Sequence, residues 1–155
     1  MKRFDFRLSS LLDFREYLER LAKKEIAVAL RNVKNSQKAI DKLKDKYIKT
    51  AIELDQIILK GMTTQQLQLY NKYLDIMDQS IVQEKLKKNE LNRILDQKML
   101  ELTKKTIDKK VIEKLKQKKK AEYMEEYRKS EQKIIDEIVS LKKARELNYE
   151  SASEN

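Results

Sequence analysis

The sequence predicts an all-α protein in which two long helices fold back on each other as an antiparallel coiled-coil hairpin. Three observations predict this fold. Pro, the strongest helix breaker, is absent, and Gly, the next strongest, occurs once. Apolar residues recur at alternating steps of three and four, which is the repeat of a coiled coil. The single glycine, Gly61, stands in a short segment that carries both a helix stop and a helix start.

The first helix is predicted over about residues 5–59. Its core stripe continues through five heptads and consists of Ala22, Ile26, Ala29, Val33, Ser36, Ile40, Leu43, Tyr47, Thr50, Leu54 and Ile57. Leu8, Leu11, Arg15 and Leu18 extend the stripe towards the N-terminus. The steps from Leu18 to Ala22 and from Ala22 to Ile26 are both four, a stutter that locally unwinds a left-handed supercoil.

A tight turn is predicted over about residues 60–64. Gly61 suits the position after a helix end, where the backbone is left-handed. Thr63 and Gln66 then form a Thr-x-x-Gln capping box for the next helix. Because so short a connection makes neighbouring helices antiparallel, the chain is expected to double back here.

The second helix is predicted over about residues 64–147, followed by a disordered tail at 148–155. Its stripe begins with Leu67, Tyr70, Leu74, Met77 and Ile81. It is expected to weaken where Glu84, Lys88 and Lys98 interrupt the leucines, and to recover through Tyr123, Tyr127, Ser130, Ile134, Ile138 and Leu141. Pairing with the shorter first helix leaves about 25–30 residues over, an overhang of roughly 40 Å.

Residues 1–147 are therefore expected to form one hairpin. The stripe alone does not say whether its partner comes from the same chain or from a second copy, so an intermolecular dimer stays open as an alternative.

The net charge of +10 suits nucleic acid, an anionic membrane or an acidic protein, and is equally typical of a solvated helix surface. Residues 104–120 hold nine lysines and two acids. This run contains no aromatic residue for base stacking, and Lys rather than Arg disfavours base readout, so nucleic-acid binding is the weaker interpretation.

The longest aliphatic run, Ile26–Leu30, is far short of the ~20 residues of a membrane span. The charged N-terminus does not resemble a signal peptide, which predicts a cytoplasmic protein.

Catalysis is not expected. The sequence has no His and no Cys, and its single Gly excludes glycine-rich phosphate loops. Two long helices offer no pocket in which a second group could orient a titratable side chain. The neighbouring carboxylates of Glu125 and Glu126 point in different directions on a helix. No cofactor, metal or small-molecule substrate is predicted.

Aromatic residues gather near the turn, where Tyr47 of the first helix meets Tyr70, Tyr73, Leu74 and Met77 of the second. Core packing accounts for most of them. Tyr73 lies off the core stripe, however, and with Ile76 it would present apolar surface to solvent. Aromatic and methionine side chains are favoured in protein interfaces, so core packing and partner contact stay open as alternatives for this cluster.

Residues at both ends and at the turn resemble the flagellar export protein FliJ family. The N-terminal part of the likeness is Phe6-Arg7-Leu8-x-x-Leu11-Leu12-Asp13-x-Arg15-Glu16. The C-terminal part is Tyr123-x-Glu125-Glu126-x-Arg128-x-x-Glu131-Gln132-Lys133-x-x-Asp136-Glu137. At the centre, Gly61 is followed by Tyr70-x-x-Tyr73, whereas residues 82–120 carry no family motif.

This resemblance implies a hairpin similar to the central stalk subunit of rotary ATPases. Members of the family act in the flagellar type III export apparatus, peripherally at the inner face of the cell membrane. They bind the ring of the export ATPase FliI, promote its assembly and link it to the export gate protein FlhA. An escort role towards export chaperones is also ascribed to them.

The resemblance also implies two contact surfaces. The expected ATPase contacts, at the end that holds both termini, are Arg7, Arg15, Glu16, Glu125, Glu126, Arg128, Gln132 and Lys133. The expected gate contacts, at the turn, are Tyr47, Tyr73, Ile76 and Met77. The same rod in a virulence export system or a rotary ATPase is a neighbouring interpretation. The alternative from another class is a basic coiled coil that binds nucleic acid or acts as a scaffold.

Overall fold

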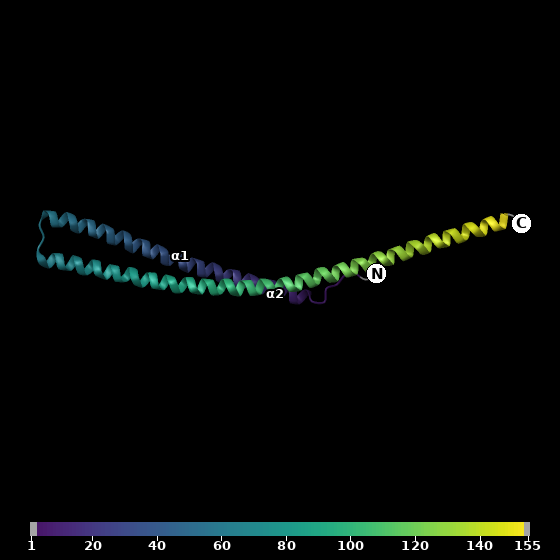
Figure 1. Ribbon diagram of the computed structural model, residues 1–155, viewed down its shortest axis with the longest axis horizontal. Coiled ribbons are helices and arrows are strands. Elements are labelled where there is room, and N and C mark those ends of the chain that lie inside the picture. Colours follow the sequence, from purple (N-terminus) through teal and green to yellow (C-terminus); the bar gives the residue numbers. More distant parts are fainter. Residues whose placement is uncertain (1–2, 154–155) are drawn as a thin grey trace. The chain divides into compact units, whose positions relative to one another are not determined.

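The computed structural model describes residues 3–153, and they form two long helices (Figure 1). Helix α1 spans Ser9–Lys60 with 52 residues, and α2 spans Thr64–Ser153 with 90 residues. The two helices pack against each other, and residues 3–153 contain no strand. The prediction of an all-α helical hairpin is therefore confirmed.

The chain divides into two compact units, and each helix contributes to both of them. The hairpin unit comprises Tyr17–Thr106 and contains the turn. The terminal unit comprises Met1–Glu16 and Ile107–Asn155, of which residues 3–16 and 107–153 are described. The single hairpin domain expected over residues 1–147 stays a prediction.

The core of the hairpin unit follows the predicted stripe. Every stripe position from Ala22 to Ile57 is buried or half-buried. Ala22, Ala29 and Ser36 recur at heptad spacing, and all three are buried. Small side chains at these positions let the two helix backbones approach, and the larger core residues then fill the space between them. These larger buried side chains are Ile40 and Leu54 from α1, with Met77, Ile81 and Leu95 from α2.

The predicted weakening of the α2 stripe is not what the structure shows. Glu84, Lys88 and Lys98 are half-buried, and they continue the core rhythm. Each is bonded to α1, since Ser36 Oγ donates to Glu84 Oε2 over 3.4 Å and Lys88 Nζ donates to Gln37 Oε1 over 2.5 Å. Lys98 Nζ lies 3.0 Å from Glu25 Oε2, and this bond raises the pKa of Lys98. Hydropathy alone misses such positions. The aliphatic part of a long polar side chain packs between the two helices, while its charged group extends to the edge of the interface.

The turn forms as the sequence predicts. Gly61 has a φ of 102°, and its N–H donates to the carbonyl of Ile58 over 3.2 Å. The capping box is closed in both directions, since Gln66 N donates to Thr63 Oγ1 over 3.3 Å and Thr63 N donates to Gln66 Oε1 over 3.2 Å. These bonds provide acceptors for backbone N–H groups at the start of α2 that have no acceptor within the helix.

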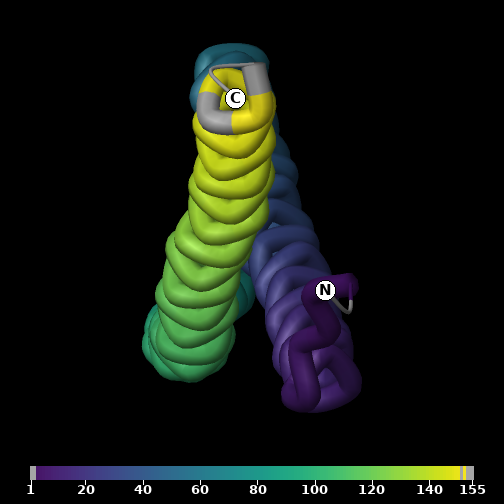
Figure 2. Tube along the Cα trace, turned by 90° about the vertical axis from the view of Figure 1, so that its right-hand side faces the viewer, coloured from purple at the N-terminus to yellow at the C-terminus, as the bar shows by residue number. Residues whose placement is uncertain are grey.

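Helix α1 begins later than expected, at Ser9 instead of about residue 5. Residues 3–8, which we call the N-terminal strap, are not helical (Figure 2). The N–H of Ser9 donates to the carbonyl of Phe6 over 2.9 Å, and the Phe6 side chain is only 8% exposed. Burial of the Phe6 ring competes with helix formation here, which periodicity does not reveal.

Helix α2 extends further than expected, to Ser153 instead of about residue 147. The disordered tail expected at 148–155 is thus helical over 148–153, and residues 154–155 lie outside the described residues. The segment 148–153 contains no Pro or Gly to stop the helix. The expected recovery of the stripe is only partial, because Tyr123, Tyr127 and Ser130 are half-buried while Ile134, Ile138 and Leu141 are exposed.

Candidate partner-binding surfaces

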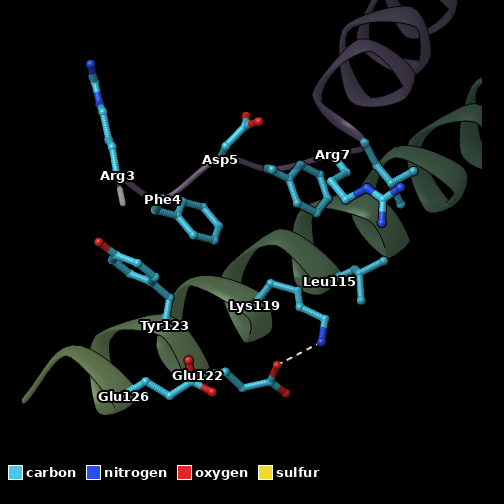
Figure 3. Close-up of a pocket in the computed structure, with 11 residues that line it drawn as sticks. Arg3, Phe4, Asp5, Arg7, Leu115, Lys119, Glu122, Tyr123 and Glu126 are labelled. Atoms are coloured by element: carbon cyan, nitrogen blue, oxygen red, sulfur yellow. Dashed lines mark hydrogen bonds and ion pairs between the residues drawn. The ribbon is translucent and has the colours of Figure 1, made fainter. Parts of the chain in front are cut away.

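The N-terminal strap and α2 line an open groove of about 650 Å³ in the terminal unit (Figure 3). The ring of Phe4 lies over that of Tyr123, with centroids 5.5 Å apart, whereas Arg3 and Asp5 point away from α2. Tyr123 in turn lies 6.3 Å from the ring of Tyr127. The groove therefore has an aromatic wall and a charged rim, a combination suited to binding a protein side chain.

The rim of this strap groove carries both signs of charge. Arg7 and Lys119 contribute cations, while Glu122 and Glu126 contribute carboxylates. Lys119 Nζ lies 2.9 Å from Glu122 Oε2, and this bond lowers the pKa of Glu122 and raises that of Lys119. Arg7 is exposed at this rim, and Glu126 lies close enough to Lys119 and Lys129 for its charge to raise their pKa values.

Arg15, one of the expected ATPase contacts, forms an ion pair within the chain. Its Nη1 lies 3.2 Å from Asp108 Oδ2, and its buried Nε has no hydrogen-bond partner in the described chain. Arg15 therefore joins α1 to α2 within the terminal unit. Asp108 has no place in the family likeness, so sequence reasoning missed this contact.

The remaining terminal candidates lie along α2 and mostly bond within it. Glu125 Oε1 is 2.8 Å from Lys129 Nζ, and this bond lowers the pKa of Glu125. Gln132 Nε2 donates to Asp136 Oδ1 over 2.8 Å. The Nε of Arg128 donates to the carbonyl of Met124 over 3.4 Å. Glu16 of α1 is half-buried, and Lys133 is exposed. The structure brings Arg7 and Glu126 into one groove, but it does not gather the whole predicted set.

Sequence reasoning also missed most of the strap groove. Phe4, Leu115, Lys119 and Tyr123 line it, yet none was a predicted contact residue. One signal was available, because the sequence contains only three Phe and two of them stand at positions 4 and 6. Aromatic residues two apart, just before a helical repeat, indicate an extended segment that packs through its side chains.

The second candidate surface lies near the turn in the hairpin unit. Tyr73 is 42% exposed and Ile76 is 51% exposed, as their positions off the core stripe predict. Tyr47 is half-buried, whereas Met77 is 5% exposed and belongs to the core. Leu69 is exposed and stands one heptad before Ile76, so it extends the same face of α2. We call Leu69, Tyr73 and Ile76 the turn face. Nothing in the described chain covers its exposed apolar area.

The two candidate surfaces are built from charged, aromatic and aliphatic side chains. The chain lacks the nucleophiles and bases His and Cys, and its Asp and Glu side chains form no metal-binding group of three within residues 3–153. Within residues 3–153, neither α1 nor α2 contains an apolar stretch that could span a bilayer. The exposed grooves and apolar faces are instead typical of a protein that binds other proteins.

The fold thus defines the protein as a helical hairpin of two long α-helices. The family model described as "Flagellar FliJ protein" matches residues 4–148. The chain belongs to this family, whose members are non-catalytic components of the flagellar export apparatus. The comparisons with curated proteins and with solved structures gave no match.

Proposed function

We propose that this protein is the stalk and chaperone component that connects the export ATPase to the export gate. The terminal unit binds the ring of the ATPase FliI and promotes its assembly, and the turn face binds the gate protein FlhA. The observation that carries the proposal is the family match, which includes both ends and the turn. ATP hydrolysis belongs to the partner. The protein acts in the cytoplasm at the inner face of the membrane, and export chaperones are further partners.

Two features of the terminal unit support ATPase binding. The strap groove presents Arg7 and Glu126 beside an aromatic wall, so it offers a partner both charge and apolar area. Beyond it, the described side chains of residues 131–150 are all exposed, and Ile134, Ile138 and Leu141 form an apolar stripe on one side. Nothing in the described chain covers this apolar stripe. If the ATPase ring closes around it, the stripe is removed from water, and this burial stabilises the complex.

The exposed residues of the turn face support gate binding. Leu69, Tyr73 and Ile76 are adjacent on the surface of α2, and Tyr73 adds a hydroxyl that can bond at the edge of an apolar contact. Met77 lies beneath them in the core, so its role here is to hold the α2 backbone in place. Tyr47 contributes a half-buried ring from α1.

The first experiment measures ATP hydrolysis and ring assembly by the export ATPase across a concentration series of this protein. The wild type is expected to raise both. Arg7→Glu should weaken the effect, because it reverses a rim charge of the strap groove, whereas Tyr73→Ala should leave it unchanged. Ring assembly that does not respond to the wild-type protein would contradict the stalk assignment.

The second experiment measures binding to the purified cytoplasmic part of the gate protein. Tyr73→Ala and Ile76→Ala are expected to weaken this binding, while Arg7→Glu keeps it. A matched control is Ile58→Ala, which removes an exposed apolar side chain from α1 instead. If all three apolar replacements act alike, the turn face is not the specific contact.

A further inference from the structure

We propose that an exposed face of α2 in the terminal unit is a docking surface for an acidic amphipathic helix of a partner protein. This lysine face consists of Ile107, Lys110, Val111, Lys114 and Lys118. It lies outside the strap groove and the turn face, and no residue of it enters the proposed function. Its assignment therefore goes beyond the role at the ATPase and the gate.

The five residues share one side of the helix. Each of them lies three or four residues from at least one other member, and residues so spaced are surface neighbours. All five side chains are exposed, and the two apolar ones, Ile107 and Val111, are 55% and 60% exposed. The opposite side of this segment is occupied, because Asp108 bonds to Arg15 and Ile112 is half-buried. The lysine face thus points away from α1.

Of the three lysines of this face, only Lys118 acts on a carboxylate within the described residues, because its charge helps to lower the pKa of Glu122, whose ion pair is with Lys119. Lys114 has no carboxylate three or four residues away on either side. Carboxylates stand at that distance from the other two, but Glu113 pairs with Lys109 and Glu122 pairs with Lys119. Lys110, Lys114 and Lys118 stand at four-residue spacing, so their like charges repel one another on the helix surface. A partner that brings carboxylates relieves this repulsion.

The apolar residues decide which acidic partner fits. Ile107 and Val111 lie among the lysines, so a ligand that contacts the cations also covers two branched apolar side chains. Phosphates of nucleic acid gain nothing from this contact, and the segment has no aromatic ring on which a base could stack. A membrane-bound helix needs a wider apolar face, usually with Trp, Phe or Leu. A helix with Glu at four-residue spacing beside a row of Leu matches both features.

The test uses a fluorescently labelled synthetic helix with Glu at three successive four-residue steps beside a row of Leu, titrated with the full-length protein. Anisotropy is expected to show binding that weakens steeply as salt is added. Replacing Lys110, Lys114 and Lys118 together by Gln should weaken binding about tenfold, since three rim ion pairs contribute roughly 1.4 kcal/mol in all. Replacing Ile107 and Val111 by Ser should weaken it at every salt concentration.

The matched control replaces Lys34, Lys38 and Lys42 by Gln. These three lysines have the same four-residue spacing on α1 and are all exposed, so their replacement removes the same charge. Circular dichroism checks that each variant keeps its helix content. No binding by the wild type, or an equal loss in both triple variants, would overturn the proposal. So would tighter binding through the lysine face to a DNA oligonucleotide or to vesicles that contain phosphatidylglycerol.

Discussion

Arg15 of α1 and Asp108 of α2 are 93 residues apart in the sequence, yet Arg15 Nη1 lies 3.2 Å from Asp108 Oδ2. This pair connects the two helices within the terminal unit, next to the segment that carries the lysine face. The family likeness implies an ATPase contact for the same guanidinium, and that contact stays a prediction.

The energetic coupling between Arg15 and Asp108 is expected to be below ~1 kcal/mol, because both side chains are partly exposed and the pair is screened by water. Urea unfolding of the wild type, Arg15→Gln, Asp108→Asn and the double variant measures it as a double-mutant cycle. The coupling should shrink further in high salt. A coupling of several kcal/mol would instead mean that the pair is desolvated in solution.

Gly61→Ala is expected to destabilise the protein by ~1 kcal/mol. A Cβ at this position would meet no atom within 4 Å, so the cost comes from the backbone, whose φ is 102°. Thermal unfolding followed by circular dichroism measures the loss. Gly61→Asn should cost less, since Asn tolerates left-handed backbone better than Ala. Equal losses for Ala and Asn would contradict this explanation.

Lys88→Leu is expected to raise the melting temperature of the hairpin. Lys88 occupies a core position of α2, and replacing a half-buried cation by an apolar residue removes the cost of desolvating it. Gln37, its partner, keeps a hydrogen bond because its Nε2 donates to Asp41 Oδ1 over 2.8 Å.

The control for this change is Lys85→Leu, which places the same residue at an exposed position of the same helix. Its melting temperature should stay near that of the wild type. If Lys88→Leu instead lowered the melting temperature, the bond to Gln37 would be a net stabilising contact.

Lowering the pH is expected to reduce the helix content of α2 near its ion pairs. Bonds to Lys119 and Lys129 hold the pKa of Glu122 and of Glu125 below the ordinary value of 4.5. Because these pKa values are lower when folded, their stabilisation is complete above pH 4.5 and is lost as the pH falls through the lowered values.

Helix content between pH 7 and pH 3 measures this loss. The double variant Glu122→Gln/Glu125→Gln should show a shallower decline than the wild type, and Lys119→Gln/Lys129→Gln should behave in the same way. A decline of unchanged steepness in both variants would assign the acid response to other carboxylates.

Amide hydrogen exchange should be fastest in the C-terminal part of α2. The described side chains of residues 131–150 are all exposed, so tertiary packing gives this segment no protection, and isolated helix ends fray. Exchange over residues 22–57 should be slower, because the stripe there is packed. Mass spectrometry with peptide resolution compares the two segments. Equal protection in the free protein would mean that a second copy covers the Ile134–Leu141 stripe.

The turn was predictable because its signals are local. Gly61, Thr63 and Gln66 act on backbone groups within a few residues of themselves, so their identities fix the helix stop, the cap and the reversal. The α1 stripe was predictable for a similar reason, since a repeat over five heptads leaves one face for the core. The strap was not, because the burial of Phe6 depends on contacts far along the chain.

The candidate surfaces divide in the same way. Tyr73 and Ile76 could be placed on an exposed face because they lie off a regular stripe. Met77 could be assigned to the core by the same rule, yet it was also expected at the gate contact, and its burial favours the core role. The strap groove could not be predicted, because Phe4 and Tyr123 meet only after the chain has folded.

The sequence by itself determined that this chain is helical, that it reverses at Gly61, and which face of α1 is buried, because all three follow from local propensity and repeat. The tertiary structure alone decided that Glu84, Lys88 and Lys98 lie in the interface between the helices, and that Arg15 pairs with Asp108. The physical reason is that a polar side chain takes its role from whichever group lies opposite it. That neighbour is fixed by packing between distant segments, and no local pattern encodes it.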